Sequence, residues 1–200
     1  AGEIVNVMLT RGIKSPQGAS LNSSYLWYFT VETEISAGIF SPPVNYVAGS
    51  SPWSVFSADL DGDSDMDLAL ANFVSGDISV FKNNGDGTFA SAVNYGVGSL
   101  PHGVFCADLD GDGDLDLAVA SYSTDNVSIL KNNGDGTFQS AVNYGVGDNP
   151  YSVFCANLDK DKDLDLIVVN AGSDNISILK NNGDGTFADR NSTRLNTRHV

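Results

Sequence analysis

Apolar residues alternate with polar or small ones over short segments of this chain, and the segments recur in a fixed order. In the first copy, segments 53–58, 67–73, 78–82 and 88–97 carry this two-residue period, which is typical of β-strands with one buried face. Ile78 and Val80, for example, fall on one face of the third segment. No stretch shows the capped 3.6-residue period of a helix. The pattern predicts an all-β protein.

Turn residues separate these segments at fixed places. The sequence NNGDG at 83–87 returns at 132–136 and 181–185, and Asn-Gly and Asp-Gly tolerate the positive φ of tight turns, so it predicts a hairpin between the third and fourth strands. The whole unit repeats every 49 residues. Four-stranded units of this length are typical of β-propeller blades. We therefore expect three antiparallel blades, at about 50–98, 99–147 and 148–187.

Runs in which every second residue is Asp, or in one place Asn, occupy 59–67, 108–116 and 157–165, each between the first and second expected strands. Carboxylates packed this densely repel one another unless a hard cation lies among them. Oxygen ligands in a short flexible loop favour Ca²⁺ over the transition metals. The alternating residues, all candidate metal ligands, are Asp59, Asp61, Asp63, Asp65, Asp67, Asp108, Asp110, Asp112, Asp114, Asp116, Asn157, Asp159, Asp161, Asp163 and Asp165.

Together the DLDGDGDLDLAVA and NNGDGTF elements resemble the FG-GAP/VCBS repeats of integrin-type propellers and bacterial surface proteins, over about residues 38–187. The resemblance implies that each acidic loop binds Ca²⁺ through the side chains at its first, third, fifth and ninth positions and the main-chain carbonyl of its seventh. In the first loop these positions are Asp59, Asp61, Asp63 and Asp67, with the carbonyl of Asp65; in the second they are Asp108, Asp110, Asp112 and Asp116, with the carbonyl of Asp114.

The third loop departs from this pattern. Asn157 replaces the first carboxylate, and Lys160 and Lys162 occupy positions where glycine is usual. The lysines add positive charge near the cation and remove backbone freedom, so we expect this site to be the weakest. An EF-hand is excluded by spacing, because no register from Asp59 or Asp61 places Gly sixth and Glu twelfth.

The net charge of −15 lies mostly in these loops and turns. Nucleic acid is therefore not an expected partner, because phosphate binding needs clustered Lys and Arg. No apolar run is long enough to span a membrane. Extracellular Ca²⁺ is abundant enough to fill loops of modest affinity, so we expect a secreted or cell-surface protein. Cys106 and Cys155, one repeat apart, are expected to be small buried residues and not a disulfide.

The two ends of the chain differ from the repeats. Residues 1–37 contain EIVNVMLT and YLWYFTV and resemble the last two strands of a bacterial Ig-like domain followed by a linker. Residues 38–48 align with 87–97 and so correspond to a fourth strand. Residues 188–200 are polar and unpatterned, which leaves the third blade without a fourth strand. Closed propellers have roughly four to eight blades, so we expect a fragment of a larger propeller or self-association that completes one.

The resemblance implies adhesion or binding of an extracellular protein or glycan, and not catalysis. Two alternatives remain: an accessory propeller of a secreted hydrolase or lyase, and a lectin. In a lectin, Trp53, His102 and Tyr151, which share one repeat position, would contact the glycan; the other interpretation of these residues is packing at a strand start. No Ser or Cys keeps a fixed spacing to His102 that would suggest a catalytic triad. The NNGDG turns contain Asp86, Asp135 and Asp184. These residues are expected either to belong to the hairpin turn alone or to act as extra metal ligands.

Overall fold

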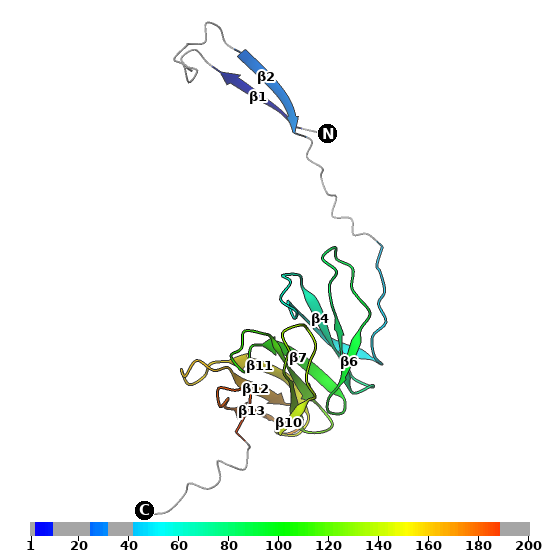
Figure 1. The fold of residues 1–200 in the computed structure, drawn as a ribbon, viewed down its shortest axis with the longest axis vertical. Helices are drawn as coiled ribbons and strands as arrows, with labels where there is room; N and C mark the ends of the chain where they lie inside the picture. Colours follow the sequence, from blue (N-terminus) through cyan, green and yellow to red (C-terminus); the bar gives the residue numbers. More distant parts are fainter. Residues whose placement is uncertain (1–2, 10–24, 32–41, 189–200) are drawn as a thin grey trace, which may run out of the picture. The chain divides into compact units, whose positions relative to one another are not determined.

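The computed structural model describes residues 3–9, 25–31 and 42–188, which belong to two separate compact units, Ala1–Val44 and Asn45–Val200 (Figure 1). In the first unit, strands β1 (Glu3–Leu9) and β2 (Tyr25–Val31) pair antiparallel. Two paired strands match the sequence expectation for this end, and the Ig-like assignment stays a prediction. The expected linker up to residue 37 and the tail from residue 189 lie outside the described residues.

The second unit consists of three antiparallel sheets that follow one another along the chain (Figure 1). The first has the order β3-β4-β5-β6, the second β7-β8-β9-β10, and the third, within the described residues, β11-β12-β13. Their strands are β3 (Pro52–Ala58), β4 (Asp67–Asn72), β5 (Asp77–Phe81), β6 (Val93–Gly96), β7 (Pro101–Ala107), β8 (Asp116–Ser121), β9 (Asn126–Leu130), β10 (Val142–Gly145), β11 (Pro150–Ala156), β12 (Asp165–Asn170) and β13 (Asn175–Leu179). The all-β fold of repeated blades is confirmed, and we call the sheets the first, second and third blade.

The fourth strand is shorter than the sequence predicted. We expected one strand over 88–97, but β6 covers only Val93–Gly96, and Phe89 makes an isolated bridge to Asn83. Val80 pairs with Val93 in the regular ladder, so residues 81–82 face residues 90–92 across the hairpin. The extra residue on one side is a bulge-like register shift, and such a shift interrupts the ladder. Alternation alone does not predict it.

The blades pack face against face through apolar cores. Ala69, Ala71, Ile78 and Val80 of the first blade lie in one cluster with the second blade's Leu117. The same positions one repeat later form the core between the second and third blades. Burying such apolar area is the main stabilising term in folding. The repeats therefore form a stack, in which neighbouring blades cover the surfaces that they turn toward each other.

Both cysteines lie in these cores as free thiols, and burial raises the pKa of Cys106 and Cys155 to about 12. This confirms the expectation of buried, unbridged residues. No helix in the described part of the chain is long and apolar enough to cross a membrane.

Candidate metal centres

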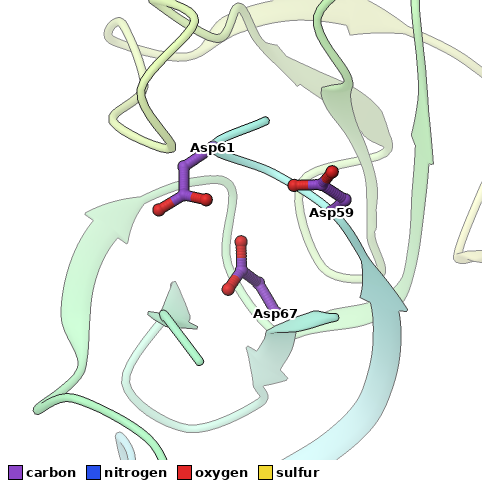
Figure 2. A group of neighbouring side chains, drawn as sticks. All are labelled: Asp59, Asp61 and Asp67. Carbon is purple, nitrogen blue, oxygen red and sulfur yellow. The ribbon is translucent and has the colours of Figure 1, made fainter. Parts of the chain in front are cut away.

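Three carboxylates converge in the first acidic loop. Asp59 follows β3 directly and Asp67 is the first residue of β4, so the strand pair brings both ends of the loop together. Oxygen atoms of Asp59, Asp61 and Asp67 all lie within 4.8 Å of one another, and Figure 2 shows the three carboxyl groups facing a common centre. Asp108, Asp110 and Asp116 form the same triad in the second loop.

Main-chain N–H groups hold the first carboxylate of each triad. Asp59 accepts hydrogen bonds from the nitrogens of Gly62 (2.8 Å) and Ser64 (3.0 Å), and Asp108 accepts the equivalent bonds from Gly111 and Gly113. The donors can reach because these residues have positive φ, from 76° to 97°. That conformation is easy for glycine and costs other residues about 1–2 kcal/mol.

The last carboxylate of each triad is fully buried. Asp116 accepts main-chain hydrogen bonds from Leu109 (3.0 Å) and Asn132 (2.8 Å), one to each oxygen. Burial raises the pKa of Asp116 to about 6, against the lowering effect of these two bonds, and the charges of Asp110 and Asp112 raise it further. Burial likewise raises the pKa of Asp67. Each of these carboxylates therefore lacks a compensating positive charge.

The middle carboxylate of each triad has one oxygen atom without a hydrogen-bond partner. The Oδ1 atoms of Asp61 and Asp110 are buried and have no hydrogen-bond partner. Buried polar atoms are rarely left unpaired in proteins. The other oxygen of each faces a lysine: Lys82 Nζ lies 3.4 Å from Asp61, and Lys131 Nζ lies 3.1 Å from Asp110. Three converging carboxylates, one of which has an unpaired buried oxygen, fit a hard divalent cation.

The remaining loop aspartates lie outside the triads. Asp63 and Asp112 accept hydrogen bonds from the main-chain nitrogens two residues later, at 2.9 Å each. The side chain of Asp65 lies against Gly85 of the NNGDG turn, as Asp114 lies against Gly134. The structure thus brings together the first, third and ninth loop positions. Ligation by these three positions, by the fifth position and by the carbonyl of the seventh stays a prediction.

The third loop is built differently. No acidic triad like the other two forms there among the residues that the structure describes. Asn157 accepts a hydrogen bond from the nitrogen of Lys160 (2.6 Å). Its amide nitrogen cannot accept a second bond, whereas the second carboxylate oxygen of Asp59 and of Asp108 does so in the first two loops. Lys160 and Lys162 have φ values of 71° and 90°, so lysine occupies strained positions. Lys180 also binds Asp159 at 2.6 Å, which lowers the pKa of that carboxyl.

Two residues that link the blades were missed at the sequence level. Asn132, the first residue of its NNGDG turn, donates to the carbonyl oxygens of Leu60 in the preceding blade (2.8 Å) and Leu115 in its own (3.0 Å). Lys82 reaches in the other direction, to the carbonyl oxygen of Asp135 in the next turn. Asn181 and Lys131 repeat both contacts one blade later. The recurrence of KNNGDG every 49 residues was the available signal.

The other candidates take structural places. Asp86 accepts bonds from the nitrogen and hydroxyl of Thr88 at 2.9 and 2.6 Å, which lower its pKa; Asp135 and Asp184 do the same with their own threonines. His102 is buried between the rings of Trp53 (4.9 Å between centroids) and Tyr151 (4.4 Å). Burial lowers the pKa of this imidazole. His102 therefore packs between aromatic rings at the start of its strand.

Comparison with known proteins places the repeats in a family. The FG-GAP-like repeat matches residues 59–119 and 108–168, in each case from one acidic loop into the second strand of the next blade. No curated protein matches the chain. Among solved structures, similar chains include an Agrocybe aegerita lectin that recognises non-reducing terminal N-acetylglucosamine (27% identity, TM-score 0.48, 68% of this chain and 36% of the lectin). Another is the Photorhabdus luminescens Tc holotoxin pore (24% identity, TM-score 0.40, 68% of this chain and 7% of the toxin).

The chain therefore spans about a third of that lectin's length and a much smaller part of the toxin. The two family matches together cover more than half of this chain and begin at the two loops that form acidic triads. The chain belongs to the FG-GAP-like repeat family.

Proposed function

We propose that the first and second acidic loops bind Ca²⁺ and that these ions are structural. The observation that carries the proposal is the buried, unpaired Oδ1 atom of Asp61 and of Asp110, each within a triad of carboxylates. All-oxygen donors in a flexible loop suit Ca²⁺, whereas Mg²⁺ demands near-octahedral geometry and keeps its waters. A bound cation would neutralise the repulsion among the three carboxylates.

The chain's own residues prepare each site. The N–H bonds to Asp59 fix the loop's first turn, and the bonds to Asp67 from Leu60 and Asn83 fix its end. The cation would join these ends and so hold the β3–β4 connection. Because the Leu60 carbonyl also accepts a bond from Asn132 of the second blade, each site would support the packing of the following blade as well.

Calorimetric titration of the metal-free protein tests this proposal. We expect two sites that prefer Ca²⁺ over Mg²⁺, with one lost in Asp61→Asn and the other in Asp110→Asn. Asp174→Asn is the matched control, because it removes the same charge from an exposed residue outside the loops. The assignment would be contradicted if both loop variants kept two sites, or if the control variant lost a site as well.

We further propose a secreted or cell-surface location, with adhesion or ligand binding as the role and no catalysis. Extracellular modules that bind Ca²⁺ have Kd values of about 10⁻⁴ to 10⁻³ M. Loops of such modest affinity would be filled by extracellular Ca²⁺. The same titration tests this location. Dissociation constants in that range support it, whereas values near those of cytosolic buffers, about 10⁻⁹ to 10⁻⁸ M, would oppose it.

A glycan is the second candidate ligand. Trp53 and Tyr151 are 56% and 46% exposed on either side of His102, and exposed amphipathic rings are common at binding surfaces. A glycan array with the wild type, Trp53→Ala and Tyr151→Ala tests this candidate. Binding lost in both variants while the circular dichroism spectrum is kept would support it, and binding unchanged in both would exclude this surface.

A further inference from the structure

Each pair of neighbouring blades meets through the same two surfaces. We call the surface that a blade turns toward the preceding blade its leading face, and the surface that it turns toward the following blade its trailing face. The leading face of the second blade comprises Val104, Leu117, Val119, Leu130 and Phe138. The trailing face of the first blade comprises Leu60, Ala69, Ala71, Ile78 and Val80. The third blade's leading face and the second blade's trailing face repeat this pairing.

The two outermost faces are apolar and open. On the first blade's leading face, Val55 is 58% exposed, and Tyr46, Leu68, Leu70, Phe81 and Phe89 line an apolar groove of about 190 Å³. On the third blade's trailing face, Ile176 is 60% and Ile178 45% exposed, whereas their counterparts Val127 and Ile129 are buried. The described part of the chain thus carries one unused copy of each half of its own blade interface.

Polar partners for this interface are also present on both faces. Within the chain, Asn132 and Asn181 donate to the carbonyls of Leu60 and Leu109 in the preceding blade. At the same repeat positions, the two open faces carry Asn83 on the first blade and the carbonyl of Leu158 on the third. Lys131 donates to the carbonyl of Asp184 in the following blade at 2.5 Å. The groups at the same repeat positions on the open faces are Lys180 on the third blade and the carbonyl of Asp86 on the first. Lys180 is 62% exposed at its side chain, compared with 30% for Lys131.

A segment ahead of the first blade occupies the place of a fourth strand. Tyr46 contacts Phe89 edge-on with centroids 5.5 Å apart, as Tyr95 contacts Phe138 (5.4 Å) and Tyr144 contacts Phe187 (5.3 Å). In the last two pairs the tyrosine belongs to the fourth strand of the preceding blade. Residues 45–48 therefore lie where that strand would lie, and the third blade has three strands among the described residues.

We propose that the first blade's leading face docks on the third blade's trailing face in a second copy of this chain. Residues 45–48 of the copy that supplies the first blade then pair with β13 of the other copy and complete its third blade. In the complete blades Ser79 donates to Asn94 and Ser128 to Asn143, so Ser177 of one copy is expected to donate to Asn45 of the other. Such head-to-tail contacts close only if the rotation permits it; two copies would supply six blades, within the roughly four to eight of closed propellers.

One difference makes this contact weaker than the internal ones. Ala69 and Ala71 of the first trailing face correspond to Ile167 and Val169 on the third blade. The larger side chains hold the docked sheets further apart, and overfilling an interface is destabilising. The association is therefore expected to depend on protein concentration. It also depends on apolar faces, so it goes beyond the proposed metal role and can fail or succeed independently of it.

Sedimentation and light scattering of the full chain, from about 1 to about 100 µM, test the proposal. We expect a monomer–dimer transition in the wild type, and monomers for Leu70→Glu and for Ile176→Glu, because each blocks one face. A mixture of these two variants should dimerise through the remaining pair of faces, whereas the double variant should not. The variant Ile167→Ala/Val169→Ala should associate about ten-fold more tightly. Circular dichroism checks that each variant folds.

A cysteine pair provides a second test that does not disrupt folding through a buried charge. Asn45→Cys on one copy and Ser177→Cys on another should form a mixed disulfide on oxidation, and neither variant alone should form that dimer. A wild type that stays monomeric throughout, or Glu variants whose mixture behaves as the separate proteins do, would overturn the proposal. Association that survives in the double variant would place the contact elsewhere and overturn it equally.

Discussion

The side chain of Asn132 in the second blade donates a 2.8 Å hydrogen bond to the carbonyl oxygen of Leu60, inside the acidic loop of the first blade. The same amide also bonds to Leu115 of its own loop. A single buried asparagine thus ties two consecutive acidic loops together. The loops are therefore parts of the blade interface as well as candidate metal sites.

Removing this tie should destabilise the fold. In Asn132→Ala, the buried carbonyl of Leu60 loses its partner, which costs about 1–3 kcal/mol. Asn83→Ala is the matched control at protein concentrations that keep the chain monomeric, because within one copy Asn83 donates only inside its own blade, to Met66. Urea denaturation of the metal-free protein should show a clearly larger loss of unfolding free energy for Asn132→Ala. Equal losses would mean that the contact between blades adds nothing.

Lys131 is expected to oppose metal binding while it supports the blade interface. Its ammonium lies 3.1 Å from Asp110 and also donates to the carbonyl of Asp184. In Lys131→Met, the competing positive charge is gone, so Ca²⁺ affinity of the second loop should rise several-fold, while the metal-free protein should become less stable. Titration and urea denaturation measure the two effects separately. Weaker calcium binding in this variant would refute the competition.

The third loop should improve when its strained positions become glycine. Lys160 and Lys162 hold φ values of 71° and 90°, a region that costs a non-glycine residue about 1–2 kcal/mol. Lys160→Gly/Lys162→Gly should therefore stabilise the metal-free protein by about 1–2 kcal/mol, less than the full sum because glycine gains unfolded-state entropy. Adding Asn157→Asp should create a third calcium site in a titration. A wild type with three equal affinities would contradict this view.

The contribution of Asp116 to stability should respond to pH in opposite directions with and without calcium. In the metal-free protein the pKa of Asp116 is about 6, above its ordinary value of 3.8. The folded state therefore binds more protons than the unfolded state between these values, and the contribution of this carboxyl falls as pH rises from about 4 to about 6. A bound cation keeps the carboxyl ionised in the folded state, which reverses the sign.

Denaturation at both ends of this pH range, with and without calcium, checks the reversal. Aspartates with lowered pKa values outside the loops, such as Asp86, contribute the same slope in both conditions, so the difference between conditions isolates the loops. We expect the calcium-dependent gain in unfolding free energy to grow as pH rises through about 6. A gain independent of pH would argue against Asp116 as a ligand.

The repeats were predictable because their signals are local. Alternating residues such as Ile78 and Val80 predicted buried strand faces, and both are buried; the glycines of NNGDG predicted the turns, and Gly85 and Gly87 have positive φ. The strand break before Val93 and the links through Asn132 and Lys82 were not predicted. They depend on register and on contacts between blades, which no single repeat contains.

The candidate sites were predictable in position but not in detail. Spacing located Asp59, Asp61 and Asp67, and the structure brings them together. Spacing could not reveal that Asp63 bonds within the loop or that Lys180 already pairs with Asp159. These contacts depend on the loop's folded shape and on a residue 21 positions away from its partner.

Thermal unfolding with Ca²⁺ and with EDTA tests the central claim most directly. If both triads bind structural calcium, Ca²⁺ at about 30 times its Kd should add about 2 kcal/mol for each filled site, and the two sites together should raise the Tm by about 10 °C in a domain of this size. Asp61→Asn/Asp110→Asn should lose that increase, and Asp174→Asn should keep it. A wild-type Tm that is the same in calcium and in EDTA would contradict the account.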